Sequence, residues 1–200
     1  MKDQFHTIKQ VILHLIAFYQ SESKGISITK LYKLLYFIDF GHYALNQSSI
    51  TKLNYLKFKY GPVPFGVDTL LKSMEENGLL NKQWISDSYD GHYLFKAEQK
   101  DYLKGLDLNE KEQATIEKTA RAFLDSSATE ASEETHYHYS WLSTDNGKII
   151  AYETAQHCDF PWLGYYNNKS EEEFKEIQNS RNTIKKSPTI NKLFDKIQKL

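Results

Sequence analysis

The stretch SEETHYHYSW brings together side-chain types that can bind metal ions or transfer protons. Glu133 and Glu134 precede His136 and His138, and carboxylates and imidazoles serve as zinc ligands and as general bases. On a helix, residues two apart point in different directions, so His136 and His138 are poorly placed to hold one ion. Glu134 and His138 share a helix face, but such a pair is more often solvated than half of a site. We therefore expect no metal centre here.

Cys158 is the single cysteine and the strongest nucleophile by type. A catalytic thiol needs a histidine and a group that orients it, and the adjacent His157 says nothing about spatial pairing. The glycines are isolated, so the chain lacks a phosphate loop, a dinucleotide fingerprint and a nucleophile elbow. We expect no catalytic residue and no cofactor. An enzyme with an unrecognised site around Asp39 or His136 is kept as a third hypothesis.

Asp39 is the one carboxylate within the apolar stretch KLLYFIDFGHYALN. Burying a carboxylate without hydrogen-bond donors is strongly unfavourable, so this side chain must reach solvent or be met by donors. His42 follows at i+3 and could be a partner. Two interpretations stay open: an exposed edge of the helix, or a buried polar site. Asp39 and His42 are our candidates for the second.

A long helix is expected to carry these two residues. Ser27 is a plausible N-cap, because its hydroxyl can accept a hydrogen bond from the first turn, and the helix then runs to about Asn46. An amphipathic helix over residues 5–19 precedes it. The apolar residues of the long helix form two stripes and require cover on two sides: Ile28, Leu31, Leu35 and Ile38; Leu34, Phe37 and Leu45. This helix should be the central one of the fold.

Short β elements are expected to follow. Apolar residues and lysines alternate over residues 56–60, which predicts a short strand. Pro64 would then begin a helix that ends at Asn77-Gly78, since proline is tolerated in a first helical turn. Asp90-Gly91 between two aromatic-rich runs predicts a β-hairpin.

Two capping boxes mark further helix starts, Asn109 with Glu112 and Ser127 with Glu130, and the second helix should reach about Tyr139. The predicted fold is mainly α: a compact helical domain over residues 1–166 around a central apolar helix, with a small β-hairpin or short sheet and a wing-like hairpin. Residues 167–200 are predicted to form a C-terminal helical extension that packs on the domain.

The composition argues against several classes of protein. The 200 residues carry a formal net charge of -1, so the whole molecule is not attracted to nucleic acid or to an anionic membrane. One cysteine excludes an intrachain disulfide and fits a reducing compartment. We see neither a signal peptide nor an apolar run long enough to span a membrane. These features predict a cytoplasmic protein without a membrane partner.

The third helix followed by a hairpin is an arrangement found in winged-helix domains. A helix that enters a DNA groove should expose basic and amide side chains. This one has Lys72 as its only base, against Asp68, Glu75 and Glu76, and those acids would be repelled by phosphates. The sequence thus argues against DNA binding. A winged-helix-like regulator that binds its own operator is kept as the alternative function.

Three segments in fixed order resemble the Panacea domain of SocA-like antitoxins and phage-associated proteins: ITKLYKLLYFIDFGHYALNQSSI, LKFKYGPVPFGVDTLLKSM and SEETHYHYSWLSTDNGKIIAYETA. Each motif is moderately specific, and the ordered set is considerably more so. In the third segment the chain departs from the family pattern, which has an apolar residue at Glu134 and acidic residues at Tyr137 and His138.

The resemblance implies the antitoxin of a bacterial or prophage toxin–antitoxin module, which neutralises a cognate toxin by direct protein contact. In one branch such antitoxins resemble proteolytic adaptors, so a protease is a second implied partner. The resemblance carries over no catalytic residue. It suggests these candidates for partner binding or for the family signature, each of which could also be architectural: Tyr60, Gly61, Pro62, Thr135, His136 and Trp141. The 14 tyrosines suit a contact protein. The oligomeric state is left open.

Overall fold

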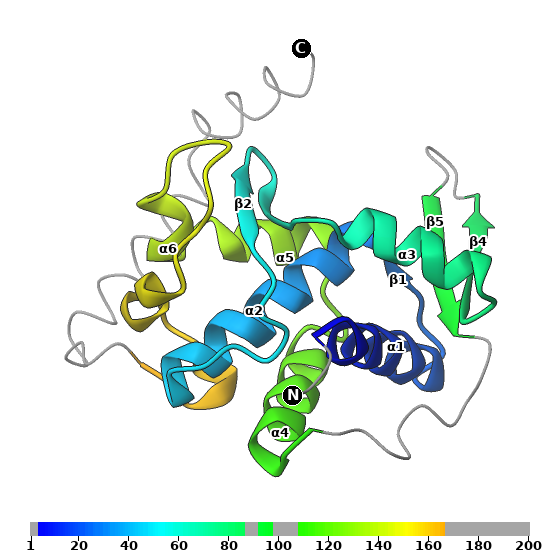
Figure 1. Cartoon of the computed structure of the whole chain (residues 1–200), viewed down its shortest axis with the longest axis horizontal. Coiled ribbons are helices and arrows are strands. Elements are labelled where there is room, and N and C mark those ends of the chain that lie inside the picture. The colour runs from blue at the N-terminus through cyan, green and yellow to red at the C-terminus, as the bar shows by residue number, and fades with distance from the viewer. Residues whose placement is uncertain (1–3, 87–91, 98–107, 167–200) are drawn as a thin grey trace. The chain divides into compact units, whose positions relative to one another are not determined.

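Helix α2 (Ile28–Asn46) is the central element of the computed structural model, which describes residues 4–86, 92–97 and 108–166 (Figure 1). The Lys30 amide donates to the hydroxyl of Ser27, the predicted N-cap. Fourteen of the nineteen residues of α2 are buried. Helices α1 (Gln4–Ser21), α4 (Glu110–Ala122) and α5 (Ala128–Thr135) pack against it. The prediction of a mainly α fold around this helix is confirmed.

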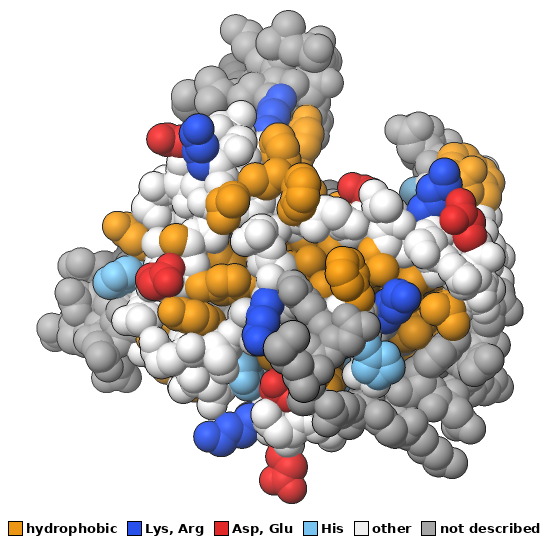
Figure 2. Space-filling model, in the orientation of Figure 1, with side chains coloured by type: hydrophobic (Ala, Val, Ile, Leu, Met, Phe, Trp, Pro, Cys, Tyr) orange, Lys and Arg blue, Asp and Glu red, His pale blue; other side chains and the backbone are white. Residues whose placement is uncertain are grey.

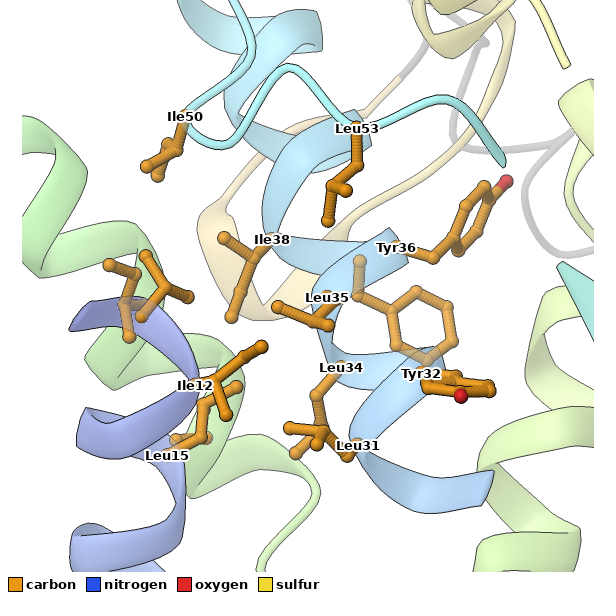
Figure 3. Packing of buried hydrophobic residues seen from close by; sticks show 14 of the residues in the cluster. Ile12, Leu15, Leu31, Tyr32, Leu34, Leu35, Tyr36, Ile38, Ile50 and Leu53 are labelled. Atoms are coloured by element: carbon orange, nitrogen blue, oxygen red, sulfur yellow. The ribbon is translucent and has the colours of Figure 1, made fainter. Parts of the chain in front are cut away.

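The core forms where α1 meets α2. Ile12 and Leu15 of α1 face Leu34 and Leu35 of α2 (Figure 3), and all four are fully buried. Burying a side chain of this size stabilises the fold by roughly 1.5–3 kcal/mol relative to exposure. Edge-on and tilted aromatic rings of α2 contact the 3-10 helices η1 (Tyr152–His157) and η2 (Pro161–Leu163): Phe40 packs against Tyr152, and Phe37 against Trp162.

A three-stranded antiparallel sheet covers one end of the helical body. Its strands are β1 (Ile26–Ser27), β4 (Leu80–Ile85) and β5 (His92–Ala97), in the order β1-β5-β4. The predicted hairpin is present, since Ile85 pairs with His92, while its turn at Asp90-Gly91 lies outside the described residues. With α3 (Val67–Glu76) directly before β4, this hairpin has the wing-like position expected.

A second antiparallel pair, β2 (Tyr55–Phe58) and β3 (Gly61–Pro64), forms a short ribbon beside α2. The sequence analysis was wrong about Pro64, which ends β3 and does not begin α3. Proline lacks an amide proton but is tolerated at the edge of a sheet. Helix α3 begins at Val67, after Gly66 in the left-handed conformation.

The stretch after Ser127 also differs from the prediction. Both capping boxes are present, but α5 ends at Thr135 and a separate short helix, α6 (Tyr139–Leu142), follows. Between them His138 adopts an extended conformation and is 1% exposed, with its ring against Tyr36 and Phe160. Burying this ring in the core overrides the local helix preference.

Within the described part of the chain, no helix is both long and apolar enough to cross a membrane. The C-terminal extension predicted for residues 167–200 lies outside the described residues, so the division at residue 166 stays a prediction.

Candidate partner-binding site

The ribbon collects the predicted signature residues from distant parts of the chain. Gly61 and Pro62 begin β3, and Tyr60 lies in the preceding turn with 59% of its surface exposed. The other predicted residues, Thr135, His136 and Trp141, come from α5, its C-cap and α6. Thr135, His136 and Trp141 lie against the side of the ribbon that faces the helical body, which we call its inner side.

Lys33 of α2 connects the central helix to the ribbon. The sequence analysis included it in the first family-like segment but not among the candidate site residues. Its side chain is only 2% exposed, and its Nζ donates to the carbonyl oxygen of Pro62 at 2.9 Å. Burial lowers the pKa of this amine to about 8. A lysine on a helix ordinarily faces solvent, so the helical periodicity alone did not mark this one as buried.

Gly61 is required by the closeness of Lys33 and Thr135. Its φ of +94° lies in the region that favours glycine. A Cβ at this position would lie 2.5 Å from Thr135 Oγ1 and 3.0 Å from Lys33 Nζ. The Thr135 hydroxyl is itself fixed, because it donates to the Ser132 carbonyl at 2.6 Å. Glycine at position 61 therefore allows β3 to lie close to both α2 and α5.

His136 and Trp141 join α5 and α6 to β2. Their ring centroids are 4.3 Å apart, and the Lys57 ammonium lies 4.2 Å from the centroid of the Trp141 ring. The indole Nε1 donates to the Phe58 carbonyl at 3.2 Å. Burial, with Lys33 and Lys57 nearby, lowers the pKa of His136 to about 4. The imidazole is therefore neutral at pH 7, and its buried Nε2 has no hydrogen-bond partner among the described residues.

Asp39 is fully buried, so it does not lie at an exposed edge of α2. Its Oδ1 accepts from the amides of Ile50 and Thr51 at 3.0 and 2.8 Å, and the Thr51 hydroxyl donates to Oδ2. The hydroxyls of Tyr55 and Tyr152 donate to Oδ2 at 2.7 and 3.3 Å. Burial raises the pKa of Asp39, and these hydrogen bonds oppose the rise. The carboxylate thus anchors the segment that leads into β2.

His42, suggested as the partner of Asp39, is buried but bonds elsewhere. Its Nδ1 lies 3.1 Å from Thr115 Oγ1 on α4, and burial lowers its pKa. Cys158 is buried too, 3.1 Å from the Ser140 hydroxyl, and burial raises the pKa of its thiol. A protonated, enclosed thiol is a poor nucleophile. In the described ranges, no three His, Cys, Asp or Glu residues gather to hold a metal ion.

The outer side of the ribbon is exposed and apolar. Side chains alternate along paired strands, so those that do not face the helical body share one face. Leu56 pairs with Val63 in the ribbon and forms an antiparallel bridge with Ile149. We define the outer ribbon face by five residues: Leu56, Phe58, Val63, Phe65 and Ile149. Figure 2 shows hydrophobic side chains gathered over β2.

Three members of this face are prominent at the surface. Phe58, Phe65 and Ile149 have 42%, 68% and 58% of their surfaces exposed. The sequence analysis missed this face as a candidate, although the alternation of Leu56, Lys57 and Phe58 was visible. The alternation predicted a strand but not which of its sides is covered, and the structure buries Tyr55, Pro62 and Pro64.

Comparison with known proteins places this arrangement in a family. A search of curated proteins finds no match to the chain. A family model described as "Antitoxin SocA-like, Panacea domain" matches residues 31–142, which is more than half of the chain. The matched segment contains Lys33, the whole β2–β3 ribbon and Trp141. The chain therefore belongs to the SocA-like antitoxin, or Panacea domain, family.

Proposed function

We propose that this protein is the antitoxin of a bacterial or prophage toxin–antitoxin module and that it neutralises its toxin by direct protein contact. Membership of the antitoxin family supports the antitoxin role. We further propose that it acts in the cytoplasm, without chemistry of its own and without a cofactor. The buried thiol of Cys158 and the carbonyl-bound amine of Lys33 are consistent with a protein that is not an enzyme.

One observation carries the proposal of direct contact. The family-matched segment builds a fixed inner cluster around Lys33 and Gly61, and places exposed aromatic side chains on the opposite side of the same ribbon. Contiguous exposed apolar side chains on a rigid scaffold are characteristic of protein interaction sites.

The test is growth rescue. The product of the neighbouring open reading frame would be induced in a bacterial host, with and without this protein. We expect arrested growth with the neighbour alone and normal growth with both, together with co-purification of the two. Growth that stays arrested with both proteins present would overturn the proposal.

The same experiment separates neutralisation by binding from delivery to a protease. In a host lacking its main ATP-dependent proteases, an antitoxin that acts by binding still rescues growth, and the neighbour's product stays at the same level. Rescue that disappears in this host, with accumulation of the neighbour's product, would instead identify a proteolytic adaptor.

The second candidate is a DNA-binding autoregulator, favoured by one observation. The sheet order β1-β5-β4, with α3 before the hairpin, is a winged-helix-like topology. The charges on α3 oppose it, because Lys72 lies 3.8 Å from Glu76, and Glu75 holds Lys82 of the hairpin at 2.9 Å. A salt titration against the upstream operator region tests it: DNA binders lose affinity steeply as salt rises, and absence of binding at low salt would exclude this role.

A further inference from the structure

We propose that the outer ribbon face is the toxin-binding surface and that it takes a partner surface with an apolar centre and surrounding carboxylates. This inference rests on the proposed antitoxin function and adds to it the location and the chemistry of the contact.

The apolar centre follows from the pairing of three chain segments. The short sheet places Leu56 and Phe58 of β2, Val63 of β3 and the bridged Ile149 on one side. Phe65 follows β3 directly, two residues after Val63, and we assign it to the same side by alternation. Isolated exposed apolar residues need no explanation, but a contiguous set on one face does. Phenylalanine and isoleucine present large areas with few rotatable bonds, so little side-chain entropy is lost when a partner covers them.

The backbone beneath this face is already ordered. The Lys57 amide donates to the Lys148 carbonyl at 2.9 Å, the Gly147 amide to the Lys57 carbonyl at 2.7 Å, and the Ile150 amide to the Tyr55 carbonyl at 2.8 Å. On the inner side, Trp141 and Lys33 bind the carbonyls of Phe58 and Pro62. A preorganised surface loses less conformational entropy on binding, which favours affinity.

Lysine side chains beside the outer ribbon face indicate the charge of the partner surface. Two exposed lysines lie at the edges of the outer ribbon face. Lys59 lies in the ribbon turn with its ammonium 5.3 Å from the Tyr60 ring centroid, and Lys148 directly precedes Ile149. Positive charge beside an apolar centre complements a partner with carboxylates beside its own apolar patch.

The β4–β5 hairpin offers a matched comparison. The ring centroids of Trp84 and Tyr93 lie 4.8 Å apart across it. These side chains are 53% and 54% exposed, which is similar to the exposure of Phe58, Phe65 and Ile149. In this hairpin the Lys82 ammonium lies 2.9 Å from the Glu75 carboxylate. Trp84 and Tyr93 therefore serve as controls for substitutions at exposed aromatic residues.

The first experiment measures binding of the full chain to the purified product of the neighbouring open reading frame. The apolar variants are Phe58→Ser, Phe65→Ser and Ile149→Ser, and the control is Trp84→Ser. Thermal unfolding verifies that each variant is folded. We expect each ribbon variant to raise the dissociation constant at least about tenfold, and the control to change it by less than about twofold.

The second experiment tests the charge. Lys59→Glu and Lys148→Glu should slow association by about threefold to tenfold and flatten its dependence on NaCl concentration. Lys72→Glu on α3 is the control and should leave both unchanged. Association that is indifferent to salt in the wild type, or equally affected by Lys72→Glu, would overturn the charge requirement.

A photo-crosslinking residue in place of Phe65 identifies the occupant of the face. We expect crosslinks to the neighbour's product. Crosslinks to a second copy of this chain, or to residues 167–200 of the same chain, would overturn the proposal, because the face would then be covered by the antitoxin itself.

The two proposals fail in different ways. If the wild type does not rescue growth, the antitoxin function fails, and the inference that rests on it falls with it. If the wild type rescues growth and binds, while all ribbon variants rescue and bind equally well, the function stands and only the location proposed here is wrong.

Discussion

The Lys33 ammonium on the central helix lies 2.9 Å from the carbonyl oxygen of Pro62 on the ribbon. Through this contact the most buried helix of the fold holds the back of the surface that we assign to toxin binding. The contacts around Lys33 and Pro62 predict how substitutions there change the stability of the protein.

Replacing Lys33 with methionine should lower the free energy of unfolding by about 1–2 kcal/mol. The Pro62 carbonyl loses its charged donor, while relief from burying an amine offsets part of the loss. Urea denaturation measures the difference, and Lys72→Met on the exposed face of α3 should change stability by less than about 0.5 kcal/mol. Equal effects of the two substitutions would contradict the role of Lys33.

The lowered pKa of Lys33 should make the free energy of unfolding depend on pH. Between pH 8 and the ordinary lysine value of 10.5, the unfolded chain binds more protons than the folded one, so stability should rise with pH. Lys30 has a lowered pKa of about 8 as well and contributes in the same direction, whereas the raised pKa values of Cys158 and of buried tyrosines such as Tyr55 act oppositely. Unfolding measured from pH 8 to 9.5 should show a smaller rise in Lys33→Met than in the wild type. An unchanged rise would mean that Lys33 is charged in the folded state.

Gly61→Ala should destabilise the protein by more than about 2 kcal/mol. The substitution combines an unfavourable φ with a Cβ 2.5 Å from Thr135 Oγ1, and both neighbours are fixed by hydrogen bonds. Gly147→Ala is the matched control: its φ is +76°, but nothing lies within 4 Å of the added Cβ, so it should lose only about 1 kcal/mol. Similar losses at the two glycines would show that the contact with Thr135 is unimportant.

Asp39→Asn should lower the free energy of unfolding by about 3 kcal/mol. An amide is nearly the same size as the carboxylate, but its NH₂ group would face the hydroxyls of Thr51 and Tyr55, which both donate to Oδ2. Asp145→Asn, at an exposed position, should be within about 0.5 kcal/mol of the wild type. Chemical denaturation followed by circular dichroism compares the two. A wild-type stability for Asp39→Asn would mean that the buried carboxyl is protonated.

Acid should destabilise the protein partly through His136. Its pKa falls from 6.5 to about 4 on folding, so between these values the unfolded state binds more protons and stability decreases as pH falls. His14 and His42 have lowered pKa values and act in the same direction, whereas the raised pKa of Asp39 acts oppositely. The comparison is therefore with His136→Phe, which keeps a ring beside Trp141. From pH 7 to 4.5 this variant should lose less stability than the wild type; an equal loss would contradict the assignment.

Much of the fold could be predicted from local sequence signals. Ser27 and the two capping boxes, Asn109 with Glu112 and Ser127 with Glu130, start their helices where predicted, because caps act within a few residues. The β4–β5 hairpin was likewise visible from its aromatic runs.

What the sequence could not predict depends on distant contacts. Pro64 fits a helix start equally well, and only the pairing of β3 with β2 places it in a strand. The break between α5 and α6 serves the burial of His138 against Tyr36, which lies 102 residues earlier in the chain.

The candidate site was likewise predicted only in part. The family motifs pointed to Gly61, Thr135 and Trp141 by residue number, but not to their meeting around Lys33. The outer ribbon face could not be foreseen, since exposure depends on which side of a short strand the core covers.

The most direct test of the central claim, that this protein works by contact through the outer ribbon face, is amide hydrogen exchange of the full chain with and without the purified product of the neighbouring open reading frame. We predict slower exchange on binding over residues 55–66 and 147–150, and unchanged exchange in the β4–β5 hairpin. Protection confined to the hairpin or to α3, with no change in the ribbon, would contradict the account.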